Sequence, residues 1–172
     1  MARDLLLREA EEQDAAVLVD FLNQVGCETD FMTIDEAGIL MTADQMADFI
    51  RSQAASANQL YLVAFLDEEV AGVLSITADY RERLAHIGDL FMVVKRAYWN
   101  HGLGRILLEE AISWASSIGV LRRLQLTVQV RNQAAVHLYQ SVGFVIEGQQ
   151  ERGAKLDDGT FVPIYLMGLL ID

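Results

Sequence analysis

Cysteine and proline are almost absent from this sequence of 172 residues. The single cysteine, Cys27, cannot form an internal disulfide, and the first residues lack the basic, apolar and small-residue order of a secretory signal. No apolar run approaches the roughly 20 residues needed to cross a bilayer. We therefore expect a cytoplasmic protein without a membrane partner. One proline, no Gly/Ser-rich linker and no repeat predict a single domain over residues 1–172.

Positive charge is also scarce, with 13 Lys and Arg against 25 Asp and Glu, which gives a formal charge of -12. This balance argues against a nucleic-acid partner, since such affinity depends on neutralised phosphates. The deficit is concentrated in residues 1–50, which hold 12 acidic and two basic residues. The acidic half is therefore expected to face something other than an anion. Three scattered histidines and one cysteine have no metal-ligand spacing, so no metal site is expected.

Hydrophobic residues make up 52% of the sequence, enough for a sizeable core, and their spacing predicts alternating strands and helices. The segment Thr42-Ala43-Asp44-Gln45 has the form of a capping box and predicts the start of one helix. The other expected helices are 14–25, 104–118 and 133–142, and the expected strands are 5–7, 59–66, 70–78, 86–94, 124–130, 144–148 and 161–169. This order predicts an α/β fold with a mixed sheet and helices on both faces.

The most informative segment joins a buried strand to the strongest helix. It contains Gly102 and Gly104, which leave the backbone N–H groups at the helix start open to an anion, while His101 and Arg105 add donors. A Walker loop is excluded because Gly104 is not followed by Lys and Ser or Thr, and the dinucleotide fingerprint lacks its third glycine. The segment therefore predicts a phosphate site of another kind.

The stretch Trp99-Asn100-His101-Gly102-Leu103-Gly104 resembles the acetyl-CoA loop Q/R-x-x-G-x-G/A of the GCN5-related N-acetyltransferase superfamily, with Trp99 in place of Gln or Arg. Residues 132–144 are similar to that superfamily's N-x-x-A-x-x-L-Y-x-x-x-G-F block throughout. The resemblance covers the chain from residue 59 onward, and residues 1–58 match only in the order strand, helix, helix. It implies the acyl-CoA N-acyltransferase fold, a mostly antiparallel sheet of about seven strands that splays between strands 4 and 5.

The resemblance also implies how acetyl-CoA is held. Asn132 would touch the pantetheine, and Tyr139 would stand near the thioester sulfur as general acid, a role that suits a phenol of pKa about 10. The pantetheine would pair with the backbone of Met92, Val93 and Val94, and the pyrophosphate would lie against Asn100, His101, Gly102, Leu103, Gly104 and Arg105.

The general base is left open. An alkylammonium of pKa ~10 is deprotonated at pH 7 at a cost of roughly 4 kcal/mol, so a base or a water chain to one is needed. The family often keeps a carboxylate or histidine where this chain has Gly88. The neighbouring alternatives are His86, on the Gly88 face of the strand, and Asp89, on the opposite face unless a bulge redirects it.

Four acidic residues, Glu28, Asp30, Asp35 and Glu36, lie where the superfamily places its acceptor-binding wall. Solvated surface charge is one interpretation, and a pocket for a cationic amine, with Glu28 and Asp30 in it, is the other. The expected function is direct acetyl transfer from acetyl-CoA to a primary amine, either a small cation or a peptide N-terminus, in a ternary complex. The alternative is an acyl-CoA-binding sensor without turnover. A homodimer is one alternative for the oligomeric state.

Overall fold

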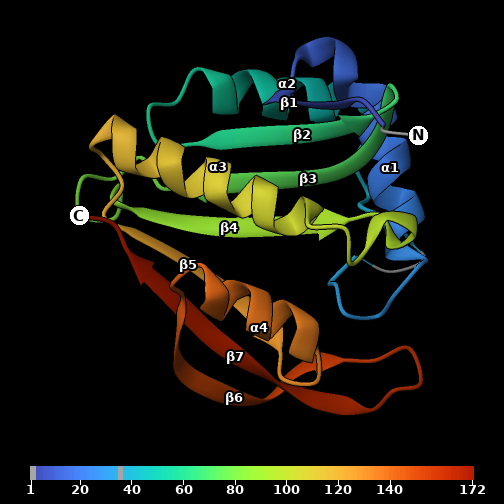
Figure 1. Cartoon of the computed structure of the whole chain (residues 1–172), viewed down its shortest axis with the longest axis vertical. Coiled ribbons are helices and arrows are strands. Elements are labelled where there is room, and N and C mark those ends of the chain that lie inside the picture. Colours follow the sequence, from blue (N-terminus) through green and yellow to red (C-terminus); the bar gives the residue numbers. More distant parts are fainter. Residues whose placement is uncertain (1–2, 35–36) are drawn as a thin grey trace.

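Within residues 3–34 and 37–172, which the computed structural model describes, seven strands form one sheet in the order β1-β2-β3-β4-β5-β7-β6 (Figure 1). The strands are β1 (Leu5–Glu9), β2 (Leu60–Leu66), β3 (Glu69–Ala78), β4 (Ile87–Val94), β5 (Arg123–Gln129), β6 (Val145–Lys155) and β7 (Phe161–Leu170). The helices are α1 (Ala15–Gly26), α2 (Ala43–Ala54), α3 (Leu103–Ile118) and α4 (Gln133–Ser141).

One pair of neighbouring strands, β4 and β5, is parallel, and the other pairs are antiparallel. This parallel pair has only three register positions, from Ile87↔Arg123 to Asp89↔Gln125. Beyond them the strands diverge, and Figure 1 shows the two halves of the sheet opening away from each other. The predicted mixed, splayed sheet is confirmed.

Helices cover both faces of the sheet. Leu107, Ala111 and Ala115 recur every four residues on α3 and are fully buried against one face, which α4 also covers. Leu18 of α1 and Ile50 of α2 pack on the opposite face. The two-sided core explains why the central strands read as continuous apolar runs. In the described part of the chain, no helix combines the length and apolarity that a bilayer span requires.

Local signals fix the helix ends well. At α2 the Thr42 hydroxyl accepts a hydrogen bond from Gln45 N–H (3.2 Å), while the Gln45 side chain accepts one from Thr42 N–H (2.9 Å). The predicted capping box is therefore confirmed. Gly119 ends α3 with a left-handed backbone (φ 72°), the usual role of glycine at a helix C-terminus.

The strand β6 is longer than expected, since the prediction ended at residue 148 and the strand continues to Lys155. Its second half is polar and exposed because it is an edge strand, so no apolar alternation marks it. Pairing with β7 holds it in place, up to Lys155↔Phe161, and an irregularity between Gln150 and Ala154 contains Arg152 with φ 54°. The length of β6 therefore depends on its pairing with β7 and not on a local sequence pattern.

Candidate active site

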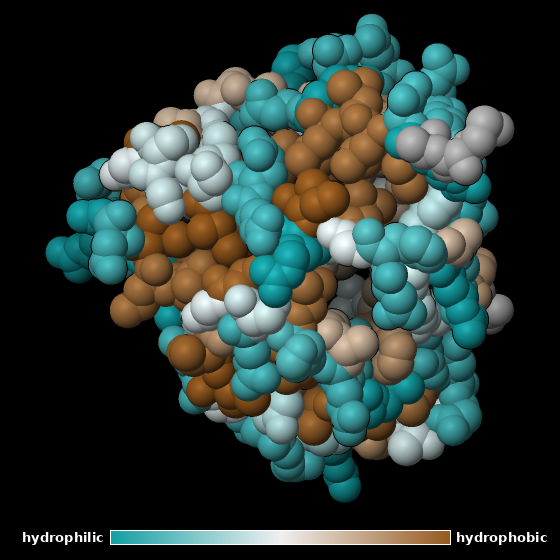
Figure 2. Space-filling model, viewed as in Figure 1, coloured by the Kyte–Doolittle hydropathy of each residue, from teal (hydrophilic) through white to brown (hydrophobic). Residues whose placement is uncertain are grey.

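A cavity of about 710 Å³ lies where β4 and β5 diverge. Its walls come from the α1–α2 connection, β4, the loop before α3, the end of β5, α4 and short parts of β6 and β7. Figure 2 shows the surface hollowed between the two halves of the sheet. The cavity therefore occupies the gap that the short β4–β5 pairing leaves.

Five consecutive residues of β4, Leu90 to Val94, line this cavity. Successive side chains of a strand point to opposite faces. Met92 packs with the α3 core and Phe91 with the α1–α2 core, so the cavity reaches both faces of the sheet. Beyond Asp89, β4 has no strand partner on its β5 side among the described residues, which leaves backbone groups of Met92 and its neighbours open to a ligand.

The cavity ends against the first turn of α3, whose initial N–H groups have no intrahelical acceptors. Gly102 is the N-cap, with a left-handed backbone (φ 81°) and no side-chain cap, and a Cβ there would meet nothing within 4 Å. At Gly104 a Cβ would lie 3.0 Å from Leu138 Cδ2, so a larger residue would require the side chain of Leu138 to shift. An open backbone at the positive end of a helix suits the pyrophosphate of acetyl-CoA.

Nearly all of the predicted cofactor residues line this cavity. They are Met92, Val93, Val94, Asn100, Gly102, Leu103, Gly104, Arg105, Asn132 and Tyr139. The exception is His101, which is exposed and whose Nδ1 pairs with the carbonyl of Trp99 at 2.7 Å. The indole of Trp99, which departs from the family pattern, donates a hydrogen bond to the carbonyl of Val94 (2.8 Å) and so ties the loop to the end of β4.

Tyr139 comes from α4, lines the cavity and is 8% exposed. Its ring packs edge-on against Phe144, with centroids 5.8 Å apart. Burial raises the pKa of Tyr139 to about 12, so the phenol is protonated at neutral pH. Asn132 caps the same helix by accepting a hydrogen bond from Ala135 N–H, which leaves its amide NH₂ as a donor on the cavity wall.

Neither candidate base lines the cavity. His86 precedes β4 at the closed end of the splay, where its carbonyl accepts from Arg122 and Arg123 N–H. Asp89 is exposed and accepts a hydrogen bond from Gln125 (2.7 Å), and the regular β3–β4 register shows no bulge that redirects it. A Cβ at Gly88 would lie 2.7 Å from Ile76 Cγ2, so the absence of a carboxylate at this position has a packing cause.

The acidic residues predicted for the acceptor wall are engaged with arginines instead. Glu28 Oε2 accepts from the backbone N–H of Arg96 (2.8 Å), and Asp30 pairs with Arg131. Neither carboxylate lines the cavity. Asp35 and Glu36 lie outside the described residues.

The sequence did not predict most of the end of the cavity away from α3, which is the candidate acceptor end. It is formed by Phe31, Met32, Thr127, Gln129, Arg131 and Ile164. These residues come from three separate parts of the chain. The one available signal was Arg131, a charged residue that follows the predicted strand 124–130 and directly precedes the family-like block of residues 132–144.

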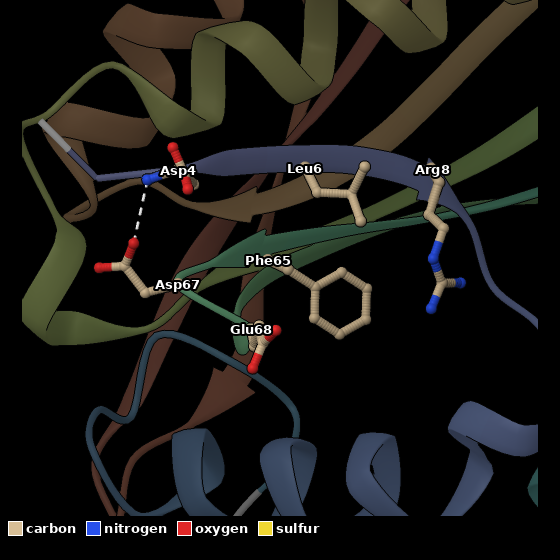
Figure 3. A pocket seen from close by; sticks show the side chains of 6 residues that line it. All are labelled: Asp4, Leu6, Arg8, Phe65, Asp67 and Glu68. Atoms are coloured by element: carbon tan, nitrogen blue, oxygen red, sulfur yellow. Dashed lines mark hydrogen bonds between the residues drawn. The ribbon is translucent and has the colours of Figure 1, made fainter.

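A second, shallower hollow of about 560 Å³ lies at the outer edge of the sheet, beside β1 and the β2–β3 turn. Figure 3 shows the side chain of Asp67 turned toward the backbone N–H of Asp4. Asp67 accepts from Asp4 N–H (3.0 Å), and Arg8 lies over the ring of Phe65 while binding Asp14. No group of three or more metal-ligating side chains is gathered here or elsewhere in residues 3–34 and 37–172.

An acetyltransferase of the GNAT family from Streptococcus pneumoniae is 60% identical in sequence and superposes with a TM-score of 0.96, covering 98% of this chain and all of that one. The L-amino acid N-acetyltransferase AaaT of Escherichia coli K12 is 35% identical over 62% of this chain and 65% of its own length. The spermidine N(1)-acetyltransferase of Vibrio cholerae is 29% identical over 54% of this chain and 53% of its own length.

The match therefore spans less than two thirds of either of these two relatives. The sequence pattern of the acetyltransferase (GNAT) family extends over residues 29–144, which include the splayed strands, the loop before α3 and all of α4. The chain belongs to the acetyltransferase (GNAT) family.

Proposed function

We propose that the protein transfers an acetyl group from acetyl-CoA directly to a primary amine. The observation that carries the proposal is the single cavity that joins the open first turn of α3 to Tyr139 and continues through the sheet to the α1–α2 connection. Such a cavity lets a cofactor and an amine approach from opposite faces and meet between β4 and β5. A ternary complex needs no nucleophile on the protein.

Acetyl-CoA supplies an activated acetyl thioester. During transfer, the amine nitrogen bonds to the acetyl carbon, the carbon–sulfur bond breaks, the sulfur gains a proton and the amine loses one. The first-turn N–H groups of α3 and the side chain of Arg105 would bind the pyrophosphate. The free backbone of Met92 and Val94 would hold the pantetheine arm.

Tyr139 would hydrogen-bond the departing sulfur and donate its proton. With its pKa near 12, full transfer to a thiolate that has the aqueous value of about 8.5 would cost about 5 kcal/mol. The sulfur would sit in the same apolar cavity, where desolvation raises its pKa as well and narrows the difference. The phenol thus acts first as a hydrogen-bond donor, and proton transfer follows as the carbon–sulfur bond breaks.

The proton of the incoming ammonium would leave through water toward Asp89. Asp89 lies two residues before Phe91 on the same face of β4, and Phe91 lines the cavity. The side chain is exposed, so solvent can connect it to the cavity. His86 precedes the strand at the closed end of the splay, farther from the reacting atoms.

The test is release of free CoA thiol with and without amines, including amino acids and spermidine, the acceptors named for two relatives. Amine-dependent, saturable release from the wild type, lost in Tyr139→Phe, is the expected result. A protein that binds acetyl-CoA saturably but releases no thiol with any amine would be the non-catalytic sensor instead.

A further inference from the structure

The cavity has an unusual charge for an amine-binding site. Among its described lining residues, two are charged at neutral pH, and both are arginines. Arg105 lies at the cofactor end, on the first turn of α3, whereas Arg131 lies at the acceptor end beside Phe31. The described lining residues include no aspartate, glutamate, lysine or histidine. A polycation would therefore meet one positive charge and no carboxylate on the described lining, because the partly exposed carboxylate of Asp30 lies outside the lining and is bound to Arg131.

Arg131 is held rigidly. Its Nε donates to the side-chain oxygen of Gln129 (2.8 Å), and its Nη2 donates to both the carbonyl and the carboxylate of Asp30. Its guanidinium carbon stands 4.5 Å from the centre of the Phe31 ring. Gln129 is only 4% exposed and also binds the Asp30 carbonyl, so it fixes the spacing between the strand end and the α1–α2 connection.

One nitrogen of this guanidinium, Nη1, has no acceptor within residues 3–34 and 37–172. An arginine whose other nitrogens are fixed presents the remaining N–H groups in a preset direction, which lowers the entropic cost of binding an anion. A carboxylate is the planar anion that matches a guanidinium in geometry.

The surrounding wall is apolar. Met32 and Phe91 pack together with the α1–α2 core, and Ile164 of β7 closes the other side. Thr127 adds a hydroxyl from β5. This combination of one cation and several apolar side chains suits a ligand that carries both a carboxylate and a hydrocarbon group.

We propose that Arg131 binds the carboxylate of the acceptor, which is a free α-amino acid with an apolar side chain. This inference rests on the proposed acetyl transfer and names its substrate class. Arg131 is then a specificity-determining residue that selects zwitterionic amines and repels polyamines. Asp30 has a positioning role, because it orients the guanidinium from outside the cavity lining.

The experiment measures CoA-thiol release with four acceptors: L-leucine, L-leucinamide, 3-methylbutylamine and spermidine. In the wild type, L-leucine should have the highest kcat/KM. In Arg131→Gln, the KM for L-leucine should rise about tenfold to a hundredfold, the usual range for a lost charged hydrogen bond. The kcat/KM for L-leucinamide should stay within about twofold, since this substrate has no carboxylate to lose.

Two further variants separate recognition from structure. Arg122→Gln removes an exposed arginine outside the cavity and should change none of the four values. Asp30→Asn loosens the same connection but keeps the cation, so L-leucine should retain its preference over L-leucinamide. If Arg131 only supports the loop, Asp30→Asn and Arg131→Gln would impair L-leucine and L-leucinamide alike, and the inference would be overturned.

A wild type that prefers spermidine or 3-methylbutylamine would also overturn the inference while leaving acetyl transfer intact. Absence of thiol release with all four acceptors, despite saturable binding of acetyl-CoA, would instead defeat the proposed function, and this inference with it. The two failures are therefore distinguishable within one set of assays.

Discussion

Gly102 and Gly119 hold the same left-handed backbone at opposite ends of α3, with φ of 81° and 72°. Neither would bring a Cβ within 4 Å of another residue. A side chain at either position therefore costs conformational strain but causes no clash. The difference between them is location, since Gly102 lines the cavity and Gly119 does not.

This pair gives a matched test of the cofactor loop. Gly102→Val should weaken acetyl-CoA binding by at least about tenfold, because a branched side chain would stand where the pyrophosphate approaches the backbone. Gly119→Val should lower stability to a similar extent, by roughly 1–2 kcal/mol, yet leave affinity unchanged. Titration calorimetry and thermal unfolding measure the two effects. Equal affinity in both variants would show that the loop does not hold the cofactor.

Removing the phenol of Tyr139 tests the proton donor. Tyr139→Phe keeps the ring against Phe144 and should lower kcat on the order of a hundredfold with little change in the affinity for acetyl-CoA. Because burial raises the pKa of Tyr139 to about 12, ionisation of this phenol should cause no fall in wild-type kcat up to about pH 10. Tyr61→Phe is the control, since Tyr61 is buried on the α1–α2 side outside the cavity.

The two candidate bases can be separated at one pH. Asp89→Asn preserves the size of a side chain that accepts a hydrogen bond from Gln125, and it should lower kcat/KM for the amine about tenfold at pH 7. His86→Asn should leave kcat/KM unchanged because His86 lies at the closed end of the splay. If steady-state kinetics instead showed a lower kcat/KM for His86→Asn and an unchanged value for Asp89→Asn, His86 would be the proton acceptor.

Stability should depend on the ion pair between Arg8 and Asp14. Both guanidinium NH₂ groups of Arg8 donate to the Asp14 carboxylate (2.7 and 3.0 Å). These hydrogen bonds lower the pKa of Asp14, and they outweigh burial, which raises it. A lowered folded pKa stabilises the protein above the unfolded value of about 3.9, and this contribution is lost as the pH falls through the folded value.

Asp14→Asn should therefore lower the free energy of unfolding by about 1–3 kcal/mol at pH 7 and by progressively less toward pH 3. Urea unfolding at both pH values measures the difference. Asp48→Asn, on the exposed face of α2, is the control and should show no measurable change. A deficit of the same size at pH 3 would mean that the pair does not act through its charge.

The sequence predicts the elements whose signals are local. The capping box at Thr42, the C-terminal Gly119 and the apolar spacing of α3 each place a helix end or face within a residue or two of the structure. The residues that line the candidate cofactor end of the cavity follow for the same reason, because the loop before α3 is a continuous segment. Only His101 departs from that prediction, since its ring turns back to Trp99.

The acceptor end depends on pairs that are distant in sequence. Asp30 and Arg131 are separated by 101 positions, and nothing near either residue reveals that they meet. The prediction of acidic side chains facing the acceptor rested on their position between two helices. The structure gives the Asp30 carboxylate an arginine partner, because a partly buried charge is stabilised by an opposite one, and it gives the Glu28 carboxylate the backbone N–H of Arg96.

The α1–α2 connection bridges the open end of the gap between β4 and β5. It is bonded through Glu28 to Arg96, just beyond β4, and through Asp30 to Arg131, just beyond β5. With the Asp89↔Gln125 pair at the other end, these bonds close a ring around the opening. The width of this ring depends on the side-chain bonds that Glu28 and Asp30 make from the α1–α2 connection. The size of molecule that the ring admits can therefore change through Glu28 and Asp30 while the sheet itself stays the same.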